Sequence, residues 1–205
     1  DQFTIIGKDI KNEASHNIVR GIPTFGLDMK VAGMRHAMIK RSPYSEGSVE
    51  RFNQSQIESM PGIITTVILG RIPDELTEYR IMSTGVAVIG RSFWEVKKAY
   101  DALEVVWNTG PNAHKSNEWI DRQFDDVLSD DAFDTLYQSG EPDGVMVEAD
   151  NIIEATYENP YWAHVCMEPH NCIANVTETN AQVIVGHQTT ARVARVTKAI
   201  TGLEI

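Results

Sequence analysis

The sequence predicts an α+β fold, in which helices pack against a small sheet. Two stretches, at residues 34–69 and 85–107, each read as strand, helix and strand. A pair of apolar strands and an amphipathic helix follow at residues 172–200. Strand-like runs and helical spacing thus recur along the chain, which favours mixed layers over an all-helical or all-strand architecture.

Composition excludes several classes of function. The chain has 205 residues, enough for one large or two small domains, with 42% hydrophobic and 23% charged residues. Its net charge of -11 argues against a nucleic-acid surface and against a polybasic membrane patch. No apolar run approaches the roughly 18 residues of a membrane span, so we expect no membrane insertion.

The first third of the chain contains two predicted strands. Phe3–Gly7 resembles a short strand that ends at a glycine, and Met34–Lys40 a second strand. Pro43 then stops the second strand, because proline cannot donate to a strand ladder.

A predicted helix and a predicted buried strand come next. Ser55 and Glu58 have capping-box spacing, which predicts a helix over Gln56–Met60. The β-branched run Ile63–Leu69 predicts a buried strand, and the polar stretch Asp74–Arg80 predicts a loop.

The second strand–helix–strand unit is the better defined one. Gly85–Ile89 predicts a strand, and Ser92 with Glu95 predicts a second capping box. Glu104–Trp107 predicts the closing strand, and Asn108–Asn112 has the composition of a turn and marks a boundary. The helix between them should present one apolar face, formed by Phe93, Val96, Ala99, Tyr100 and Leu103.

The region after this boundary is less regular. Ser116 should cap a helix that ends near Leu128. Residues 129–150 are acidic and poor in core-forming residues, which predicts an exposed, partly mobile connection. Ile152–Glu158 predicts a further strand.

The C-terminal region predicts a hairpin followed by a helix. Cys172–Val176 and Gln182–Val185 are the predicted hairpin strands. Thr189–Ile200 is the predicted helix, with an apolar stripe, and Gly202 is its expected stop. The stripe consists of Val193, Val196 and Ile200.

Candidate site residues are few. His164, Cys166, Glu168 and His170 would share one face of a strand, but at about 6.8 Å spacing they lie too far apart for one ion. A structural or interface role is therefore favoured over metal binding, and no metal ligand is assigned. Cys166 and Cys172 are interpreted as two buried reduced thiols, with a disulfide left open. Trp94, Trp107, Trp119 and Trp162 are interpreted as core or interface anchors.

A series of short motifs carries a resemblance to a known family. The motifs are Phe3–Lys8, Gly26–Met29 with Gly33–Met34, Arg41–Pro43, Met60–Ile63, Gly85–Val88 with Trp94, Trp107 with Gly110–Ala113, Pro160–His164, Met167–Cys172, His187–Thr189 and Thr201–Leu203. In this order they resemble the molybdopterin-binding large subunit of the xanthine dehydrogenase/aldehyde oxidase family, and most of all the isoquinoline 1-oxidoreductase beta-subunit type. Ala32 departs from the pattern, because the family has proline there.

The resemblance implies a domain organisation. Residues 1–19 would be a lead-in segment and residues 20–110 an a/b hammerhead domain. Residues 111–149 would form a helix and an acidic connection, and residues 150–205 the beginning of a molybdenum-cofactor-binding domain. The family's Gly-rich loop and its late catalytic glutamate have no counterpart here, so the chain is expected to be an internal piece without a catalytic residue and inactive alone.

The resemblance also implies a function. The complete bacterial enzyme would hydroxylate N-heterocycles or aldehydes with oxygen from water and pass electrons to 2Fe–2S clusters. Its cofactor would be molybdenum–molybdopterin in the cytosine dinucleotide form, contacted by Gln188 near the molybdenum or the pterin. Its partners would be a small 2Fe–2S subunit and the remainder of the large subunit, in the cytoplasm or the periplasm. The alternative is a non-catalytic binding or interaction module with the same fold.

Overall fold

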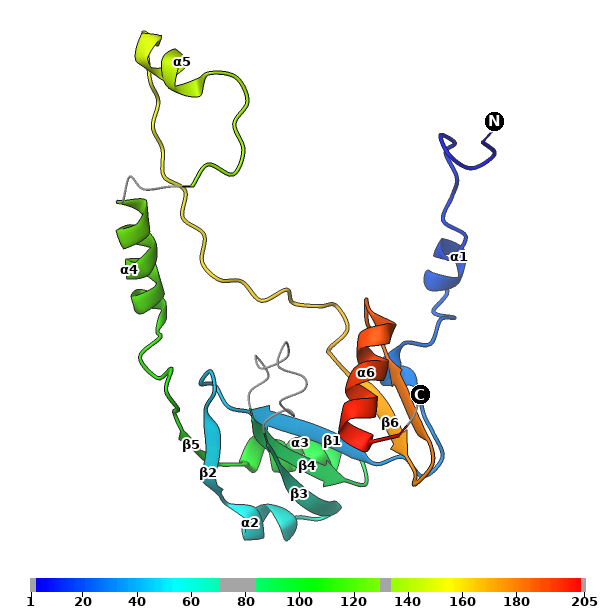
Figure 1. Cartoon of the computed structure of the whole chain (residues 1–205). Coiled ribbons are helices and arrows are strands. Elements are labelled where there is room, and N and C mark those ends of the chain that lie inside the picture. The colour runs from blue at the N-terminus through cyan, green and yellow to red at the C-terminus, as the bar shows by residue number, and fades with distance from the viewer. Residues whose placement is uncertain (1–2, 71–83, 130–133, 204–205) are drawn as a thin grey trace.

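A computed structural model describes residues 3–70, 84–129 and 134–203 of the chain. Its centre is a three-stranded antiparallel sheet in the order β1-β4-β3 (Figure 1). The strands are β1 (His36–Arg41), β3 (Ile63–Leu69) and β4 (Gly85–Gly90). The mixed helix and sheet architecture is therefore confirmed, and β1, β3 and β4 lie within two residues of their predicted positions.

Strand β4 is buried between its two neighbours, and glycine begins and ends it. A Cβ on Gly85 would lie only 2.6 Å from the backbone oxygen of Lys40 on β1. Since backbone atoms cannot move aside as a flexible side chain can, the close approach of β1 requires glycine at this position.

One face of the sheet carries the core. Helix α3 (Phe93–Ala102) and the short helix α2 (Gln54–Glu58) pack against this face and contribute the remaining core residues. The buried residues of the cluster are Ile57, Val86, Val88, Val96, Ala99 and Leu103. The predicted apolar face of α3 is thus confirmed at three positions, whereas Phe93, at the first turn of the helix, is 54% exposed.

Of the two predicted capping boxes, only the second gives a helix cap, and the Glu95 carboxylate accepts the Ser92 hydroxyl at 2.8 Å. The Ser92 hydroxyl oxygen accepts the backbone N–H of Glu95 at 3.3 Å and caps α3. The box at Ser55 is wrong, because α2 begins after Asn53 and has no side-chain cap. Glu58 is drawn away to β3, where its carboxylate accepts the backbone N–H of Thr66 at 3.0 Å and the Thr66 hydroxyl at 2.6 Å.

The stabilisation that these contacts provide depends on the ionised form of the Glu58 carboxyl. The Thr66 hydroxyl, first among several hydrogen-bond donors, lowers the pKa of Glu58 from the ordinary value of 4.5. A lowered folded-state pKa gives a stabilisation that is present above the unfolded pKa and is lost as the pH falls through the folded pKa. We expect Thr66→Val to move the Glu58 midpoint upward in an NMR titration. An unchanged midpoint would contradict the assignment.

A second, two-stranded sheet pairs β2 (Ser48–Phe52) with β5 (Val105–Asn108). Strand β5 is confirmed one residue later than predicted, but β2 was missed. Its sequence, Ser-Val-Glu-Arg-Phe, breaks the apolar alternation at the point where a β-bulge lies between Val49 and Arg51. The irregular register therefore hides the strand pattern.

The prediction that Ile63–Leu69 is a buried strand is correct for the strand and wrong for its burial. Among the strands that the structure describes, β3 is an edge strand that pairs with β4 alone, and its helix partners cover one face. Ile64, Val67 and Ile68 remain 46%, 42% and 55% exposed. A run of β-branched residues therefore does not distinguish a central strand from an edge strand here.

The N-terminal segment lies away from the sheet (Figure 1). The strand predicted at Phe3–Gly7 is wrong, because the backbone turns there and Lys8 donates to the carbonyl of Ile5 at 3.1 Å. The short helix α1 (Ser15–Ile18) and the 3-10 helix η1 (Gly26–Asp28) follow. Without a neighbouring strand, the apolar residues of 3–7 cannot form a ladder.

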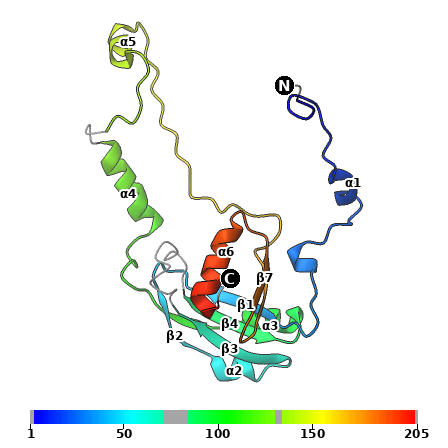
Figure 2. The ribbon, with the colours of Figure 1, turned by 45° about the vertical axis from the view of Figure 1, so that its right-hand side comes forward.

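A second extended region follows β5 (Figure 2). Helix α4 (Asn117–Leu128) is confirmed with its predicted cap, since Ser116 accepts the backbone N–H of Trp119 at 3.2 Å. Helix α5 (Pro142–Glu148) was not predicted. The strand predicted at Ile152–Glu158 is wrong, because these residues are exposed and lack regular structure.

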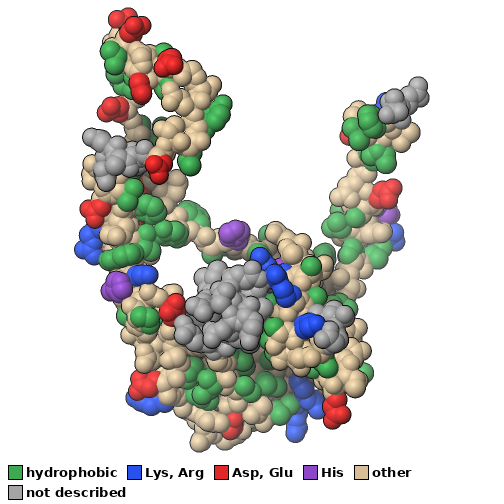
Figure 3. Space-filling view, viewed as in Figure 1, with side chains coloured by type: hydrophobic (Ala, Val, Ile, Leu, Met, Phe, Trp, Pro, Cys, Tyr) green, Lys and Arg blue, Asp and Glu red, His purple; other side chains and the backbone are tan. Residues whose placement is uncertain are grey.

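Hydrophobic side chains are exposed along both extended regions (Figure 3). Trp94 and Trp162 are 64% and 79% exposed, so neither is a core anchor. The loop predicted at Asp74–Arg80 lies outside the described residues. Among the residues that the structure describes, no helix is both long and apolar enough to cross a bilayer.

Protease accessibility should follow this division of the chain. Residues 134–150 are all exposed, whereas the sheet and α3 hold the buried cluster. We expect limited proteolysis to cut first between residues 134 and 167, because cleavage needs a locally open backbone. Early cuts within the block from Met34 to Trp107, with this region intact, would contradict the expectation. Mass spectrometry of the first products decides between them.

Candidate functional site

The C-terminal unit begins with the predicted hairpin. Strands β6 (Cys172–Val176) and β7 (Ala181–Val185) pair antiparallel, with Cys172 opposite Val185 and Val176 opposite Ala181. Thr177 closes the turn by donating its N–H to the carbonyl of Asn180 at 2.8 Å, while its hydroxyl accepts the Asn180 N–H at 3.0 Å. The predicted hairpin is confirmed, with β7 beginning one residue earlier.

Helix α6 (Thr190–Thr201) follows the hairpin. It ends at Gly202, whose positive φ of 71° gives the left-handed cap that the sequence predicts. The predicted stripe is correct in part: Val193 and Val196 are half-buried, whereas Ile200 is 65% exposed. The helix therefore turns a slightly different face to the hairpin than its sequence pattern indicates.

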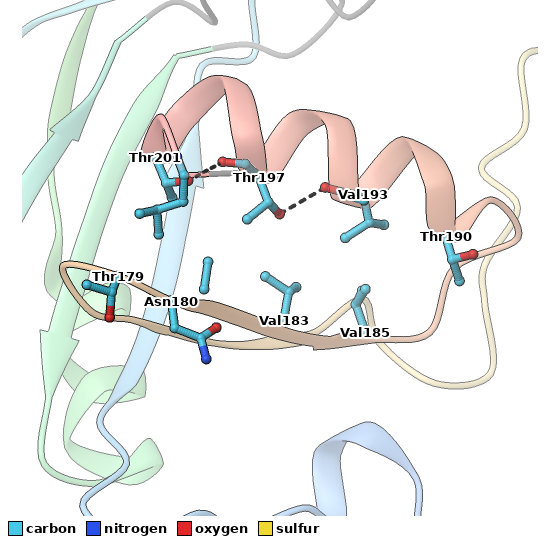
Figure 4. Close-up of a pocket in the computed structure, with 11 residues that line it drawn as sticks. Thr179, Asn180, Val183, Val185, Thr190, Val193, Thr197 and Thr201 are labelled. Atoms are coloured by element: carbon cyan, nitrogen blue, oxygen red, sulfur yellow. Dashed lines mark hydrogen bonds between the residues drawn. The ribbon is translucent and has the colours of Figure 1, made fainter. Parts of the chain in front are cut away.

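An open cavity of about 460 Å³ separates α6 from β7 (Figure 4). Val183 and Val185 line its hairpin side, and Val193 and Ala194 line its helix side. The threonine hydroxyls along the helix bond to their own backbone: Thr197 donates to the Val193 carbonyl at 2.9 Å, and Thr201 to the Thr197 carbonyl at 2.7 Å. The lining of the cavity is therefore mainly apolar.

Gln188 lies in the short connection between β7 and α6. Its side chain is exposed and does not line the cavity. Its neighbour His187 is turned toward the backbone, where its Nδ1 accepts the N–H of Thr189 at 2.8 Å. Among the residues that the structure describes, nothing hydrogen-bonds the Gln188 amide, and the residue is exposed to solvent.

The segment before the hairpin does not form a strand. The expectation that His164, Cys166, Glu168 and His170 share one strand face is therefore wrong. Cys166 and His170 approach each other, with 3.6 Å between Sγ and Nε2. Both cysteines are free and exposed, so the expectation that they are buried was wrong. Within the described parts of the chain, no three His, Cys, Asp or Glu side chains gather as a metal site would require.

Glu168 is instead the centre of a tertiary contact. One carboxylate oxygen, Oε1, accepts the backbone N–H of Leu27 at 3.0 Å and the side-chain N–H of Asn171 at 2.8 Å. The Asn171 bond, followed by the Leu27 backbone bond, lowers the pKa of the Glu168 carboxyl. A carboxylate held ionised as an acceptor for the backbone is suited to structure rather than to proton abstraction.

The chemistry available around Gln188 is that of recognition. An amide offers two donors and one acceptor oxygen without a charge, which suits a polar ligand with both kinds of group. Gln188 directly precedes the N-cap residue of a twelve-residue helix, whose first backbone N–H groups lack helical partners. These residues can bind and orient a group, and they do not form a nucleophile with an adjacent base.

Part of the chain matches a known protein family. Residues 126–205 match the sequence model of the molybdopterin cofactor-binding domain. This range covers α5, the hairpin, Gln188 and α6. The region of the chain that holds the exposed amide is thus the region that resembles a cofactor-binding domain.

Two curated proteins are similar in sequence. The isoquinoline 1-oxidoreductase subunit beta of Brevundimonas diminuta is 28% identical over 127 residues, covering 61% of this chain and 14% of that protein. The membrane-bound aldehyde dehydrogenase [pyrroloquinoline-quinone] of Gluconacetobacter polyoxogenes is 22% identical over 170 residues, covering 82% of this chain and 21% of that protein. The chain therefore spans only a minor part of the length of either relative.

Solved structures give a weaker likeness. The Cu,Mo-CO dehydrogenase in its carbon monoxide reduced state aligns with a TM-score of 0.38 and 14% identity, over 50% of this chain and 15% of that chain. Quinoline 2-oxidoreductase from Pseudomonas putida 86 aligns with a TM-score of 0.38 and 14% identity, over 51% of this chain and 16% of that chain.

The hairpin, Gln188 and α6 therefore lie in a part of the chain that is similar to a molybdopterin cofactor-binding domain. More particularly, the chain is related to the molybdopterin-binding large subunits of the xanthine dehydrogenase/aldehyde oxidase family, as the order of its motifs indicates. Of the two curated proteins, one is named as an oxidoreductase subunit and the other as a dehydrogenase.

Proposed function

We propose that this chain supplies part of the cofactor-binding surface of a molybdenum hydroxylase, with Gln188 in contact with the cofactor. The observation that carries the proposal is the position of Gln188: an exposed amide between β7 and α6, inside the range that matches the cofactor-binding domain. A residue held between a strand and a helix has a defined position, as a contact to a cofactor needs.

The residues present fit a molybdenum–pterin group. Such a cofactor presents polar ring edges and a polar metal centre, and a neutral amide can donate to one and accept from the other. When bound, the group supplies hydroxylation with oxygen from water and takes up two electrons from the substrate. The contribution of this chain is to bind and orient the group, which is the usual share of the protein in cofactor chemistry.

The proposed domain organisation assigns different roles along the chain. Residues 20–110, which hold the three-stranded sheet and its buried cluster, form the a/b hammerhead domain after a lead-in at residues 1–19. Residues 111–149 are the helix and acidic connection, and residues 150–205 begin the cofactor-binding domain. The match over residues 126–205 supports the last assignment and extends somewhat further toward the N-terminus.

The proposed substrates are N-heterocycles or aldehydes. Isoquinoline and aldehyde appear in the names of the two curated relatives, which supports both classes. The proposed partners are a small 2Fe–2S subunit, which would receive the electrons, and the remainder of the large subunit. The name "subunit beta" of one relative supports a multi-subunit assembly.

The test is cofactor analysis of the natural protein that contains this chain, purified with its partners. We expect molybdenum and a pterin in equal amounts, with cytidine monophosphate released on acid hydrolysis if the cofactor is the cytosine dinucleotide form. A quinone without molybdenum would favour the cofactor named for the aldehyde dehydrogenase relative. Absence of any cofactor would overturn the proposal in favour of a non-catalytic interaction module.

A further inference from the structure

Two segments that are far apart in sequence meet at Glu168. The bond from the Leu27 N–H to Glu168 Oε1 joins residues 141 positions apart and links η1 to the segment before the hairpin. The same oxygen accepts the side-chain N–H of Asn171, whose Nδ2 also donates to the Pro169 carbonyl at 2.9 Å. One carboxylate therefore holds both the N-terminal turn and the residue directly before β6.

The local sequence of η1 makes this contact possible. A Cβ on Gly26 would lie 2.3 Å from Asn171 Oδ1 and 3.1 Å from Glu168 Oε1. A Cβ there would displace the end of the Asn171 side chain and would require Glu168 to move by a few tenths of an ångström. Glycine at position 26 thus allows the Glu168–Asn171 pair to approach the backbone of Leu27.

The hairpin register connects this contact to Gln188. Cys172 on β6 pairs with Val185 on β7, so Asn171 lies beside the end of β7 from which the connection to α6 departs. Gln188 is the third residue of that connection. Holding Asn171 in place therefore limits the movement of the strand end that carries Gln188.

We infer that Glu168 and Asn171, docked on the backbone of the Gly26–Asp28 turn, are positioning residues for Gln188. This inference rests on the proposed function for the role of Gln188, but the contact itself does not. The N-terminal turn thereby becomes part of the support of the cofactor-binding surface, although it lies outside the range that matches the cofactor-binding domain.

Amide hydrogen exchange in the 205-residue chain tests the contact without any cofactor. The reporters are the Leu27 N–H, bonded to Glu168, and the Thr189 N–H, bonded to His187 beside Gln188. We expect Glu168→Ala to raise exchange at both by roughly tenfold, since a charge-assisted hydrogen bond is lost. Glu168→Gln keeps an acceptor oxygen at the same place and should restore most of the protection.

Three controls separate positioning from general destabilisation. Exposed Glu158→Ala should change neither reporter. Cross-strand amides of β6 and β7 should stay protected in Glu168→Ala, because the hairpin pairing is intact. Gly26→Ala disturbs the same contact from the side of the N-terminal turn, and it should raise the exchange rate at the same two amides. Unchanged exchange at Thr189 in both Glu168→Ala and Gly26→Ala would overturn the inference.

The cofactor-loaded protein separates this inference from the proposed function. If Glu168 acts through Gln188, a variant that combines Glu168→Ala with Gln188→Ala should lose no more turnover per molybdenum than Gln188→Ala alone. An additive loss would overturn the positioning role. If Gln188→Ala has no effect, the cofactor contact fails as a proposal, while the exchange at Thr189 still decides whether Glu168 orders the connection.

Discussion

Replacing Gln188 by alanine in the cofactor-loaded protein is expected to lower turnover per molybdenum by about 10²–10³, if the amide stabilises the reacting centre. A contact that mainly holds the cofactor would instead lower molybdenum occupancy. Both outcomes follow from an exposed amide between β7 and α6 within the matched range. Steady-state turnover, normalised to the molybdenum content of the same sample, distinguishes them.

The matched control for this variant is His187→Ala. The His187 ring is occupied by the backbone N–H of Thr189, so its loss should loosen the connection without removing a donor to the cofactor. We expect a smaller decrease in turnover than for Gln188→Ala. Full turnover and full molybdenum occupancy in the Gln188 variant would leave the described part of this chain without an assigned cofactor contact.

Ile57→Ala is expected to have the largest effect on stability. Ile57 is fully buried and is the residue by which α2 joins the core with Val86, Val88 and Val96. Truncating a buried isoleucine to alanine costs about 2–5 kcal/mol, because transfer free energy is lost and a cavity remains. Since small domains have roughly 5–15 kcal/mol of stability, a loss of this size would unfold a substantial fraction of the sheet domain on mild heating.

Ile64→Ala provides the comparison. It has the same chemistry, but Ile64 lies at the bulge of β3 and is 46% exposed. We expect it to cost less than about 1 kcal/mol, in line with substitutions outside the core. Urea unfolding monitored by tryptophan fluorescence measures both variants. Equal losses for Ile57 and Ile64 would contradict the description of the core.

Local signals predicted local structure well in this chain. Ser92 and Ser116 were identified as helix caps, and Gly202 as a helix stop, because each acts within one turn of its own helix. The hairpin at residues 172–185 was also found, since its two strands are close in sequence and are separated by turn residues. Features that depend on a few neighbouring residues were accessible to sequence reasoning.

Features that depend on distant partners were not. Glu58 has capping-box spacing from Ser55, yet it bonds to Thr66 on the next strand, a competition that spacing alone does not reveal. Ile152–Glu158 has strand composition but no strand beside it to pair with. The contact of Glu168 with Leu27 was likewise missed, although both belong to motifs of the family resemblance. The cofactor-binding role of Gln188 was predicted from the resemblance and stays a prediction.

The bond between Leu27 and Glu168 also constrains the order in which the chain can fold. It closes a loop of 141 positions that contains the sheets β1-β4-β3 and β2-β5 and helices α2 to α5. Closing so long a loop costs more entropy than pairing the strands of the central sheet, which are joined over shorter separations. The central sheet should therefore form first. The N-terminal turn should dock on the hairpin segment last, so that the support of Gln188 is completed only on an already folded domain.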